Sequence, residues 1–518
     1  MSPRTSATQT RTPWFIGVAG LTVSVFGVLL VWALVSAPFS LGDEPRHFNS
    51  VLRLMQGGGW PEPRTAPMLE GTIVASREAG HPLVGAALKE PVAADERSIV
   101  GEMSGAVAGE IDWMTQHPPF YYAVVAGIMK AAGGDGWRWD ELLMGMRIVS
   151  AAIVAAAVPF VAAAVRMVTG SAAASLVGAG VILAIPQFFH VGSLVTNDAL
   201  VVLVGAALIY LCLRALTNPV GLMRMALVAG IVLGLGLVTK GLMLAAVPTV
   251  VVVFLVAGLK TRGTVLRRLL PATVSMAVAF MTGGWWWLRN ILVLGEVQPS
   301  IYGSGREEES VSGYDPWFFV TTAIGRINQT FWGSIRESLD LPAILTTILG
   351  LLAIAAIVAT IVFARWRGAY LLVLTYPALA AGIFLFHAWE IYWNLGTTPG
   401  IQGRYLFGAI TLLAIAVGFC WWRFAGSRHS AIPMATGLVL FGGFAIVGAY
   451  GWRFTFRTEW GSPHGWQTAV AEMLQSTGWD SVGLATTLTA TLLGATALIA
   501  SFARLAISER RTTEPPGS

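Results

Sequence analysis

Two adjacent carboxylates follow the first long apolar stretch of the sequence. Asp43 and Glu44 open the segment LGDEPRHFNSVLRLMQGG, and His47 lies one helical turn after Asp43. A carboxylate at a lipid–water boundary suits a general base, because partial burial and a neighbouring like charge raise its pKa. These three side chains could also hold a metal ion, although such local ligands without CxxC or HExxH spacing are a weak signal. The structural alternative is that Asp43 caps a helix, with Pro45 in its first turn.

Three cations interrupt or end later apolar stretches. Lys240 lies in GLVTKGLMLAAVPTV, Arg289 in GGWWWLRNILVLGE and Arg404 in IQGRYLF. A cation at membrane depth costs roughly 2.5–3.5 kcal/mol on insertion scales, so it needs a partner or a function. Snorkelling to the interface is the structural alternative for Lys240. Guanidinium groups suit phosphate oxygens, and together the three cations predict a pocket for a substrate with an anionic phosphate and a long apolar tail.

Four further polar residues lie near the same predicted boundary. His117 precedes a Pro-Pro pair in HPPFYY, and Asp198 follows Thr-Asn at the start of a predicted helix. His387 and Glu390 lie shortly before Arg404 in the sequence. Each also has a structural alternative. A Pro-Pro start explains the first motif, and an N-cap is the more frequent role for Asn or Asp at a helix start. These four residues are predicted as contributors to substrate binding.

The composition places these residues in a membrane protein. Of 518 residues, 55% are hydrophobic and 12% are charged, with a mean hydropathy of +0.67, against about 25% charged residues in soluble proteins. A soluble enzyme is therefore excluded. The net charge of +5 does not indicate nucleic-acid binding, because the basic residues cluster in short loops between apolar stretches, the positive-inside pattern of membrane proteins.

About twelve stretches reach the ~20 residues that cross a bilayer, giving an all-α polytopic protein of 11–13 transmembrane helices. The predicted spans are 14–39, 142–165, 172–192, 197–214, 222–239, 241–258, 270–292, 341–364, 369–388, 404–425, 432–451 and 482–505. Whether the stretch 119–133 crosses the membrane determines the direction in which every later helix crosses it. The positive-inside rule favours a juxtamembrane or re-entrant helix there, which places both termini in the cytoplasm.

This topology puts the candidate chemistry outside the cell. Polar loops at 40–118, 293–340, 389–403 and 452–481 face the exterior, and the apolar spacing after Glu44 predicts a short amphipathic helix along the membrane surface. The chain divides into a cytoplasmic tail (1–13), a catalytic membrane module (14–410), C-terminal transmembrane helices (411–505) and a disordered cytoplasmic tail (506–518).

In their order, these motifs resemble the GT-C superfamily of membrane glycosyltransferases that use polyprenyl-phosphate sugars. The resemblance covers about 40–410 and rests on the acidic pair, HPPFYY, the outward Asp198, VTKG, WWWLRN and IQGRYLF. The acidic pair and IQGRYLF look most like a bacterial family of predicted membrane proteins linked to cell-wall polymer glycosylation. The Asp-Glu pair departs from the Asp-x-Asp of metal-requiring members, which leaves a divalent metal an open question.

The resemblance implies a role for each residue. Asp43 is expected as the general base, with Glu44 orienting or assisting it. Lys240, Arg289 and Arg404 are expected at the lipid phosphate, and His47, His117, Asp198, His387 and Glu390 complete the candidate substrate-binding set.

The expected activity is inverting transfer of a sugar from a polyprenyl-phosphate donor to a cell-envelope glycan or glycopolymer, on the outer face of a bacterial cytoplasmic membrane. Membrane lipids are the other expected partners, and no nucleic acid is expected. A transporter or flippase of lipid-linked saccharides is the rival from another class, although no inverted repeat is visible in the sequence. A third alternative is an assembly scaffold without catalytic activity.

Overall fold

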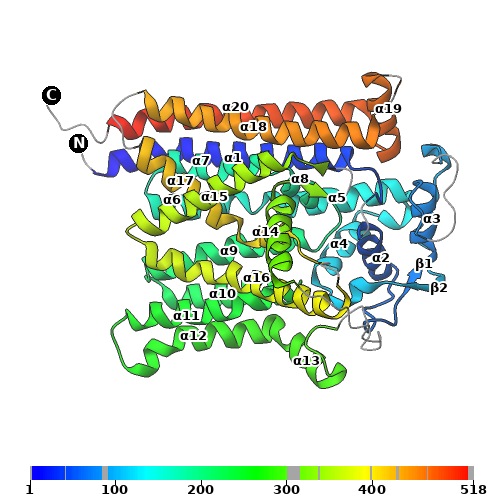
Figure 1. The fold of residues 1–518 in the computed structure, drawn as a ribbon, viewed down its shortest axis with the longest axis horizontal. Coiled ribbons are helices and arrows are strands. Elements are labelled where there is room, and N and C mark those ends of the chain that lie inside the picture. The colour runs from blue at the N-terminus through cyan, green and yellow to red at the C-terminus, as the bar shows by residue number, and fades with distance from the viewer. Residues whose placement is uncertain are drawn as a thin grey trace.

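The computed structural model describes residues 3–40, 43–83, 92–299, 315–335, 339–396, 400–426, 431–461, 463 and 465–511. Long helices lie side by side along one direction (Figure 1). Within these ranges, ten helical stretches are long and apolar enough to cross a membrane, or eleven if one bent pair counts as a span. The protein is therefore a multi-pass membrane protein of all-α class, as the sequence predicts.

The crossing stretches correspond to the predicted spans. They are built from α1 (Pro3–Val35), α5 (Trp139–Ala155) with α6 (Val158–Thr169), α9 (Asp198–Thr217), α11 (Ala246–Leu259), α12 (Val265–Ala279) with α13 (Trp285–Leu294), α15 (Ala343–Phe363), α16 (Arg367–Leu395), α17 (Ile410–Trp421), α18 (Ile432–Trp460) and α20 (Ser481–Arg511). The bent pair is α7 (Ala172–Gly180) with α8 (Pro186–Gly192), and the twelfth predicted span is the shorter α10 (Leu222–Leu237).

Glycines allow close contact between the longest helices. A Cβ atom added to Gly20 of α1 would lie 2.6 Å from the carbonyl oxygen of Gly494 in α20. The reverse substitution, at Gly494, would place a Cβ atom 2.7 Å from the carbonyl oxygen of Gly20. Small residues at such crossings let helix backbones approach closely, which supplies packing energy where lipid removes the hydrophobic driving force.

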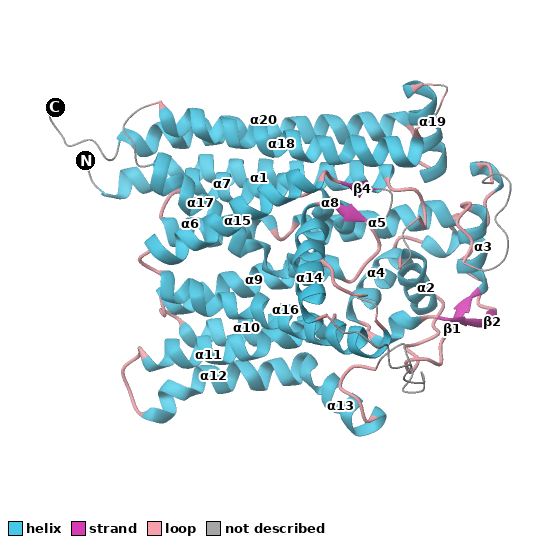
Figure 2. Ribbon diagram, viewed as in Figure 1, coloured by secondary structure: helices cyan, strands magenta, loops and turns pink. Residues whose placement is uncertain are grey.

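The long polar loops predicted to be external lie at one end of the bundle. Figure 1 shows both chain termini at the other end, away from α2 (Glu44–Met55), α3 (Glu70–Glu78) and α19 (Trp466–Thr477). Strands β1 (Pro67–Leu69) and β2 (Ala106–Ile111) pair antiparallel at the same end as α2 (Figure 2). The structure therefore places the predicted external loops together, opposite the termini.

Helix α2 follows the acidic pair as predicted, and protein surrounds it. All its residues except Leu54 are buried by protein, and it packs against α4 (Phe120–Ala131), α3 and β1. Its apolar face therefore packs against protein, and its position relative to the membrane surface stays a prediction. Two of its polar residues are satisfied inside the protein: Asn49 and Ser50 donate hydrogen bonds to the buried carboxylate of Asp112, at 2.7 and 2.9 Å.

The stretch predicted at 119–133 forms α4, which has twelve residues. At 1.5 Å per residue it is about 18 Å long, too short for a hydrocarbon layer of about 30 Å. This length agrees with the juxtamembrane interpretation.

Two helices lie where the sequence predicts only polar loops. Helix α14 (Pro316–Trp332) lies within loop 293–340, of which residues 300–314 and 336–338 are outside the described part. It runs across the direction of the long helices (Figure 1). The side chain of Asp315 caps it by accepting from the backbone N–H of Trp317 at 2.9 Å. Asp followed by Pro is a helix-start signal, so the sequence carried the information. Helix α19 lies within loop 452–481.

The chain ends differ slightly from the predicted division. Helix α1 begins at Pro3, inside the predicted tail 1–13, and α20 continues to Arg511. The remainder of the predicted disordered tail, residues 512–518, lies outside the described residues.

One membrane segment is broken. Helices α7 and α8 meet at an angle of 76°. Pro186 begins α8, and Ile185 before it is non-helical, with φ −119° and ψ 85°. This bend follows from proline chemistry, because the ring removes a backbone N–H and disfavours the helical conformation of the preceding residue. Helix α8 is thereby turned across the bundle.

Candidate active site

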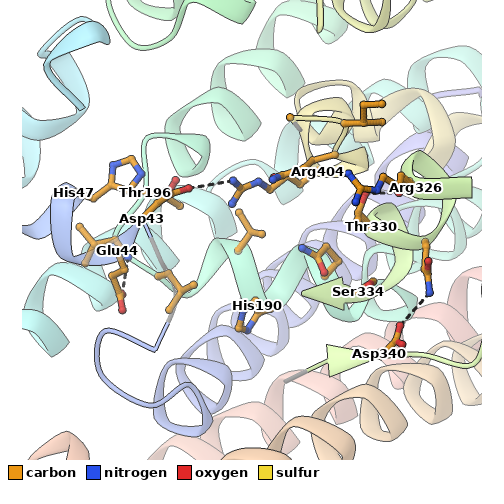
Figure 3. Close-up of a pocket in the computed structure, with 18 residues that line it drawn as sticks. Asp43, Glu44, His47, His190, Thr196, Arg326, Thr330, Ser334, Asp340 and Arg404 are labelled. Atoms are coloured by element: carbon orange, nitrogen blue, oxygen red, sulfur yellow. Dashed lines mark hydrogen bonds and ion pairs between the residues drawn. The ribbon is translucent and has the colours of Figure 1, made fainter. Parts of the chain in front are cut away.

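A cavity of about 500 Å³ opens among the elements that carry the acidic pair and Arg404. Its walls come from the start of α2, from α8 and the turn that follows it, from α14, and from the segment 400–404 (Figure 3). Strands β3 (Ser334–Ile335) and β4 (Leu339–Asp340) close one side. The cavity is thus built by parts of the chain up to 360 residues apart.

Asp43 is the exposed acid of the pair. It occupies the N-cap position of α2, but its side chain makes no cap hydrogen bond, so the capping alternative is wrong. Its side chain is 47% exposed, and its Oδ2 lies 3.5 Å from a terminal nitrogen of Arg404. Figure 3 shows the two side chains directed toward each other. Asp43 is therefore a carboxylate that can reach a molecule in the cavity.

Glu44 is buried and fully engaged. Its two oxygens accept from Nε and a terminal nitrogen of Arg147, at 2.8 and 2.6 Å. Oε1 also accepts the backbone N–H of Val195 at 3.2 Å. Both oxygens of this carboxylate are thus occupied by protein donors. The geometry therefore favours the orienting role for Glu44, because it fixes the start of α2 and with it the neighbouring Asp43.

A second ion pair lies beside the first. The Nζ of Lys240 is 2.5 Å from Oδ1 of Asp198, and both side chains are largely buried. Lys240 therefore does not snorkel, and neither Asn197 nor Asp198 makes a side-chain cap at the start of α9. The ring of Tyr405 contacts one cation of each ion pair. Nζ of Lys240 lies 5.1 Å from its centroid, and the guanidinium of Arg404 lies 5.7 Å from it.

The two predicted histidines lie close to these charges and are buried. Nδ1 of His47 is 2.9 Å from the hydroxyl of Tyr122. Burial lowers the pKa of His47 to about 4, with Asp43 raising it and Lys240 lowering it further. Burial also lowers the pKa of His117 to about 3, with Lys240 again contributing. Both imidazoles are thus neutral at physiological pH and suit hydrogen bonding rather than charge.

Three predicted residues lie outside the cavity. Arg289 pairs with Glu62 of the first external loop at 3.5 Å, and both are partly exposed. His387 and Glu390 face each other at 3.8 Å on α16, and both are more than half exposed. None of the three lines the cavity. Arg404 lines the cavity, and Lys240 lies next to it on the ring of Tyr405 without being part of the lining, whereas Arg289 lies elsewhere.

The described part of the chain holds no group of three or more His, Cys, Asp or Glu side chains arranged to bind a metal ion. In particular, the carboxylate of Glu44 is taken by Arg147, which removes it from the suggested ligand set with Asp43 and His47. The donors present do not fit a metal site built on the acidic pair.

The middle of the chain matches a known family. Residues 116–287 match the model of the family described as dolichyl-phosphate-mannose-protein mannosyltransferase. The GT-C resemblance is confirmed over this segment. The match covers about a third of the chain and includes His117, Arg147, Asp198 and Lys240, while Asp43 and Arg404 lie on either side of it.

Two solved structures are similar in their overall arrangement. ArnT from Cupriavidus metallidurans, bound to undecaprenyl phosphate, has 14% identity and a TM-score of 0.48, over 97% of this chain and 78% of that chain. The oligosaccharyltransferase AglB from Archaeoglobus fulgidus, in complex with an inhibitory peptide and a dolichol-phosphate, has 13% identity and a TM-score of 0.41, over 84% and 56%. No curated protein sequence matches the chain.

The GT-C motifs led to four residues that line the cavity, Asp43, Glu44, His47 and Arg404, and missed the wall formed by α8. Gln187 and His190 of that helix line the cavity, and so does Arg326 of α14. The proline that interrupts the apolar stretch at 186 was the available signal, since broken helices in membranes occur where they line a cavity. The complete cavity wall includes an exposed carboxylate, two arginines and neutral hydrogen-bonding groups, and Lys240 lies beside it.

Proposed function

We propose that this protein is an inverting GT-C-type glycosyltransferase that moves a sugar from a polyprenyl-phosphate donor to a cell-envelope glycan or glycopolymer. The observation that carries the proposal is Asp43, a carboxylate exposed in a cavity of about 500 Å³ and placed beside Arg404 and the Lys240–Asp198 pair. A base and a fixed cation within one cavity, with a second cation beside it, are the groups that this transfer needs.

The reaction is a single displacement. The acceptor hydroxyl gives its proton to Asp43 while its oxygen bonds to the anomeric carbon of the donor. The bond from that carbon to the phosphate oxygen breaks, and the polyprenyl phosphate leaves with the electron pair. One displacement inverts the configuration of the sugar. No step passes through a metal ion.

The cations stabilise the leaving group. Arg404 has its Nε buried without a hydrogen-bond partner among the described residues, so its guanidinium retains donor capacity for a phosphate oxygen. Lys240 has three donors and places its ammonium near the same tyrosine ring as Arg404. Fixed positive groups aimed at developing charge lower a barrier more than the same groups would in water.

The location of the cavity supports an external site. The polar loops lie at the end of the bundle opposite both termini (Figure 1), and the loop cations favour cytoplasmic termini. We place the cavity on the exterior or periplasmic side of a bacterial cytoplasmic membrane. A lipid-bound donor suits this side, because it carries activated sugar to a place without cytosolic nucleotides.

The test is sugar transfer by purified protein in vesicles that contain polyprenyl-phosphate sugars and envelope glycan acceptors. Asp43→Asn is expected to lower turnover about 10²- to 10⁴-fold, the usual contribution of a general base. Asp95→Asn, which changes an exposed aspartate of the same external loop, is the matched control and is expected to behave as wild type. Unchanged turnover in Asp43→Asn would refute the role of Asp43.

A flippase of lipid-linked saccharides is the second candidate. The broken α7–α8 pair favours it, because transporters often place interrupted helices at a binding cavity. Protein that moves lipid-linked sugar across vesicles, yet transfers none to any acceptor, would replace the glycosyltransferase proposal with this one.

A further inference from the structure

The α8 wall of the cavity carries two buried polar side chains that the proposed chemistry does not use. Gln187 and His190 are three residues apart, so they lie on the same face of the helix. Both line the cavity, and they are 3% and 2% exposed. Figure 3 shows His190 in the part of the cavity between Glu44 and Ser334.

Each of these two side chains has one buried polar atom without a hydrogen-bond partner among the described residues. Oε1 of Gln187 and Nε2 of His190 have no hydrogen-bond partner in the described part of the chain. The other ring nitrogen of His190, Nδ1, lies 3.3 Å from Oγ of Ser36. Because leaving a buried polar atom unpaired costs about 1–3 kcal/mol, two such atoms on one cavity wall indicate a ligand that pairs with them.

The chemistry of these atoms specifies the ligand. Oε1 of Gln187 is an acceptor, so it requires a donor from the ligand. Nε2 of His190 accepts or donates according to which ring nitrogen carries the proton in the contact with Ser36, and a hydroxyl group can pair with it in either case. Hydroxyl groups donate, whereas phosphate and carboxylate oxygens only accept. The α8 wall therefore suits a hydroxylated, uncharged group and disfavours the phosphate.

The opposite wall of the cavity differs, because several of its polar groups are paired with each other. The hydroxyl of Thr330 accepts the backbone N–H of Gly403 at 2.6 Å. The amide of Gln329 donates to Asp340 at 3.0 Å. These groups are already satisfied, so among the described cavity-lining side chains the buried atoms left without a partner are Nε of Arg404 and the two atoms on α8.

We propose that Gln187 and His190 bind the hydroxyl groups of the transferred sugar and that this sugar is a neutral pentose or hexose. The inference rests on the proposed function and deepens it. The phosphate faces Arg404 and Lys240, the acceptor hydroxyl faces Asp43, and the sugar ring lies against α8. Gln187 and His190 are specificity residues in this arrangement, and they take no part in proton transfer.

The test compares the binding of two kinds of lipid. Undecaprenyl phosphate is the probe without sugar, and undecaprenyl-phosphate glucose, mannose, galactose and arabinofuranose form the sugar-bearing panel. Gln187→Leu and His190→Phe keep side-chain size and remove the unpaired polar atom. Each is expected to weaken binding of the preferred sugar lipid about 3- to 10-fold, the effect of one neutral hydrogen bond, and to leave binding of undecaprenyl phosphate unchanged.

Matched controls separate this effect from misfolding. Gln467→Leu and His81→Phe make the same changes at exposed positions away from the cavity and are expected to bind both lipids as wild type does. The thermal unfolding midpoint of every variant is measured in the same detergent.

Four outcomes bear on the inference. A loss confined to the sugar-bearing lipid supports it. An equal loss for both lipids, or no loss for either, overturns it while the role of Asp43 stands. Wild type that binds no panel sugar lipid more tightly than undecaprenyl phosphate also overturns it. Wild type that binds no undecaprenyl phosphate refutes the proposed function and the inference with it.

Discussion

The buried pair of Glu44 and Arg147 is predicted to hold the acidic end of the cavity in place. Both side chains are essentially inaccessible to solvent, and two hydrogen bonds of 2.8 and 2.6 Å join them. Arg147 also donates to the backbone oxygens of Ala33 and Ser36, at 2.7 and 2.8 Å. The pair thereby ties α5 to the end of α1 and the start of α2, next to Asp43.

Removing one partner leaves the other charge buried and unpaired, which typically costs 3–5 kcal/mol. Glu44→Gln and Arg147→Met are each expected to destabilise the protein by about that amount. The double variant leaves no unpaired charge, so its loss is expected to be clearly smaller than the sum of the two single losses. Glu44→Gln is also expected to reduce turnover, because Asp43 loses its support.

The assay is a double-mutant cycle on purified protein, with unfolding followed by tryptophan fluorescence. Asp480→Asn and Arg453→Met serve as controls, since these residues lie outside the cavity and the buried pair. Single losses that add up in the double variant would show that the two side chains do not act as a pair. A Glu44→Gln variant as stable as wild type would refute the buried-charge argument altogether.

Three further predictions concern the remaining candidates. Lys240→Met is expected to lower kcat/KM about 10- to 100-fold, because one charge-assisted hydrogen bond to phosphate is lost. An unchanged kcat/KM would show that Lys240 is not part of the donor site. Arg289→Gln is expected to keep kcat/KM within about twofold, since its pair with Glu62 is partly exposed; a tenfold loss would restore it as a donor-binding residue. The folded pKa of His47, about 4, lies below the unfolded value of 6.5. The unfolded chain therefore binds more protons between these values. A contribution of roughly 3 kcal/mol is present above pH 6.5 and is lost as the pH falls toward 4. Unfolding midpoints of His47→Gln are expected to fall less with acid than those of wild type, and equal slopes would contradict this.

Much of the fold could be predicted from the sequence because apolar length is a local property. Each of the twelve predicted spans corresponds to a helix, to a pair of helices or, in one case, to a bent pair. Features that depend on tertiary packing were harder to predict from the sequence. Helix α2 has the pattern of an interfacial helix, yet the first external loop and α4 cover it. Helix α14 was missed despite its Asp315–Pro316 start, because it lies in a stretch of mixed polarity.

The site shows the same division between local and tertiary information. Asp43, Lys240 and Arg404 could be found because charges at the ends of apolar stretches are conspicuous. Arg289 has the same local signature, but the structure directs it to Glu62. Gln187 and His190 could not be found this way, since an uncharged polar residue in an apolar stretch has no distinctive pattern. Their significance depends on the bend at Pro186 and on the atoms left unpaired.

The charges of the cavity cancel in pairs, and this explains how they are tolerated beside the membrane. Asp43 faces Arg404 and, beside the cavity, Asp198 faces Lys240, so these four groups together carry no net charge. A donor phosphate changes this balance, because it competes with both acids for the two cations. In the proposed reaction the phosphate takes over Arg404 and leaves Asp43 without its partner. The oxygens of Asp43 are then open to a hydrogen bond from the acceptor hydroxyl, so binding of the donor itself prepares the site for the acceptor.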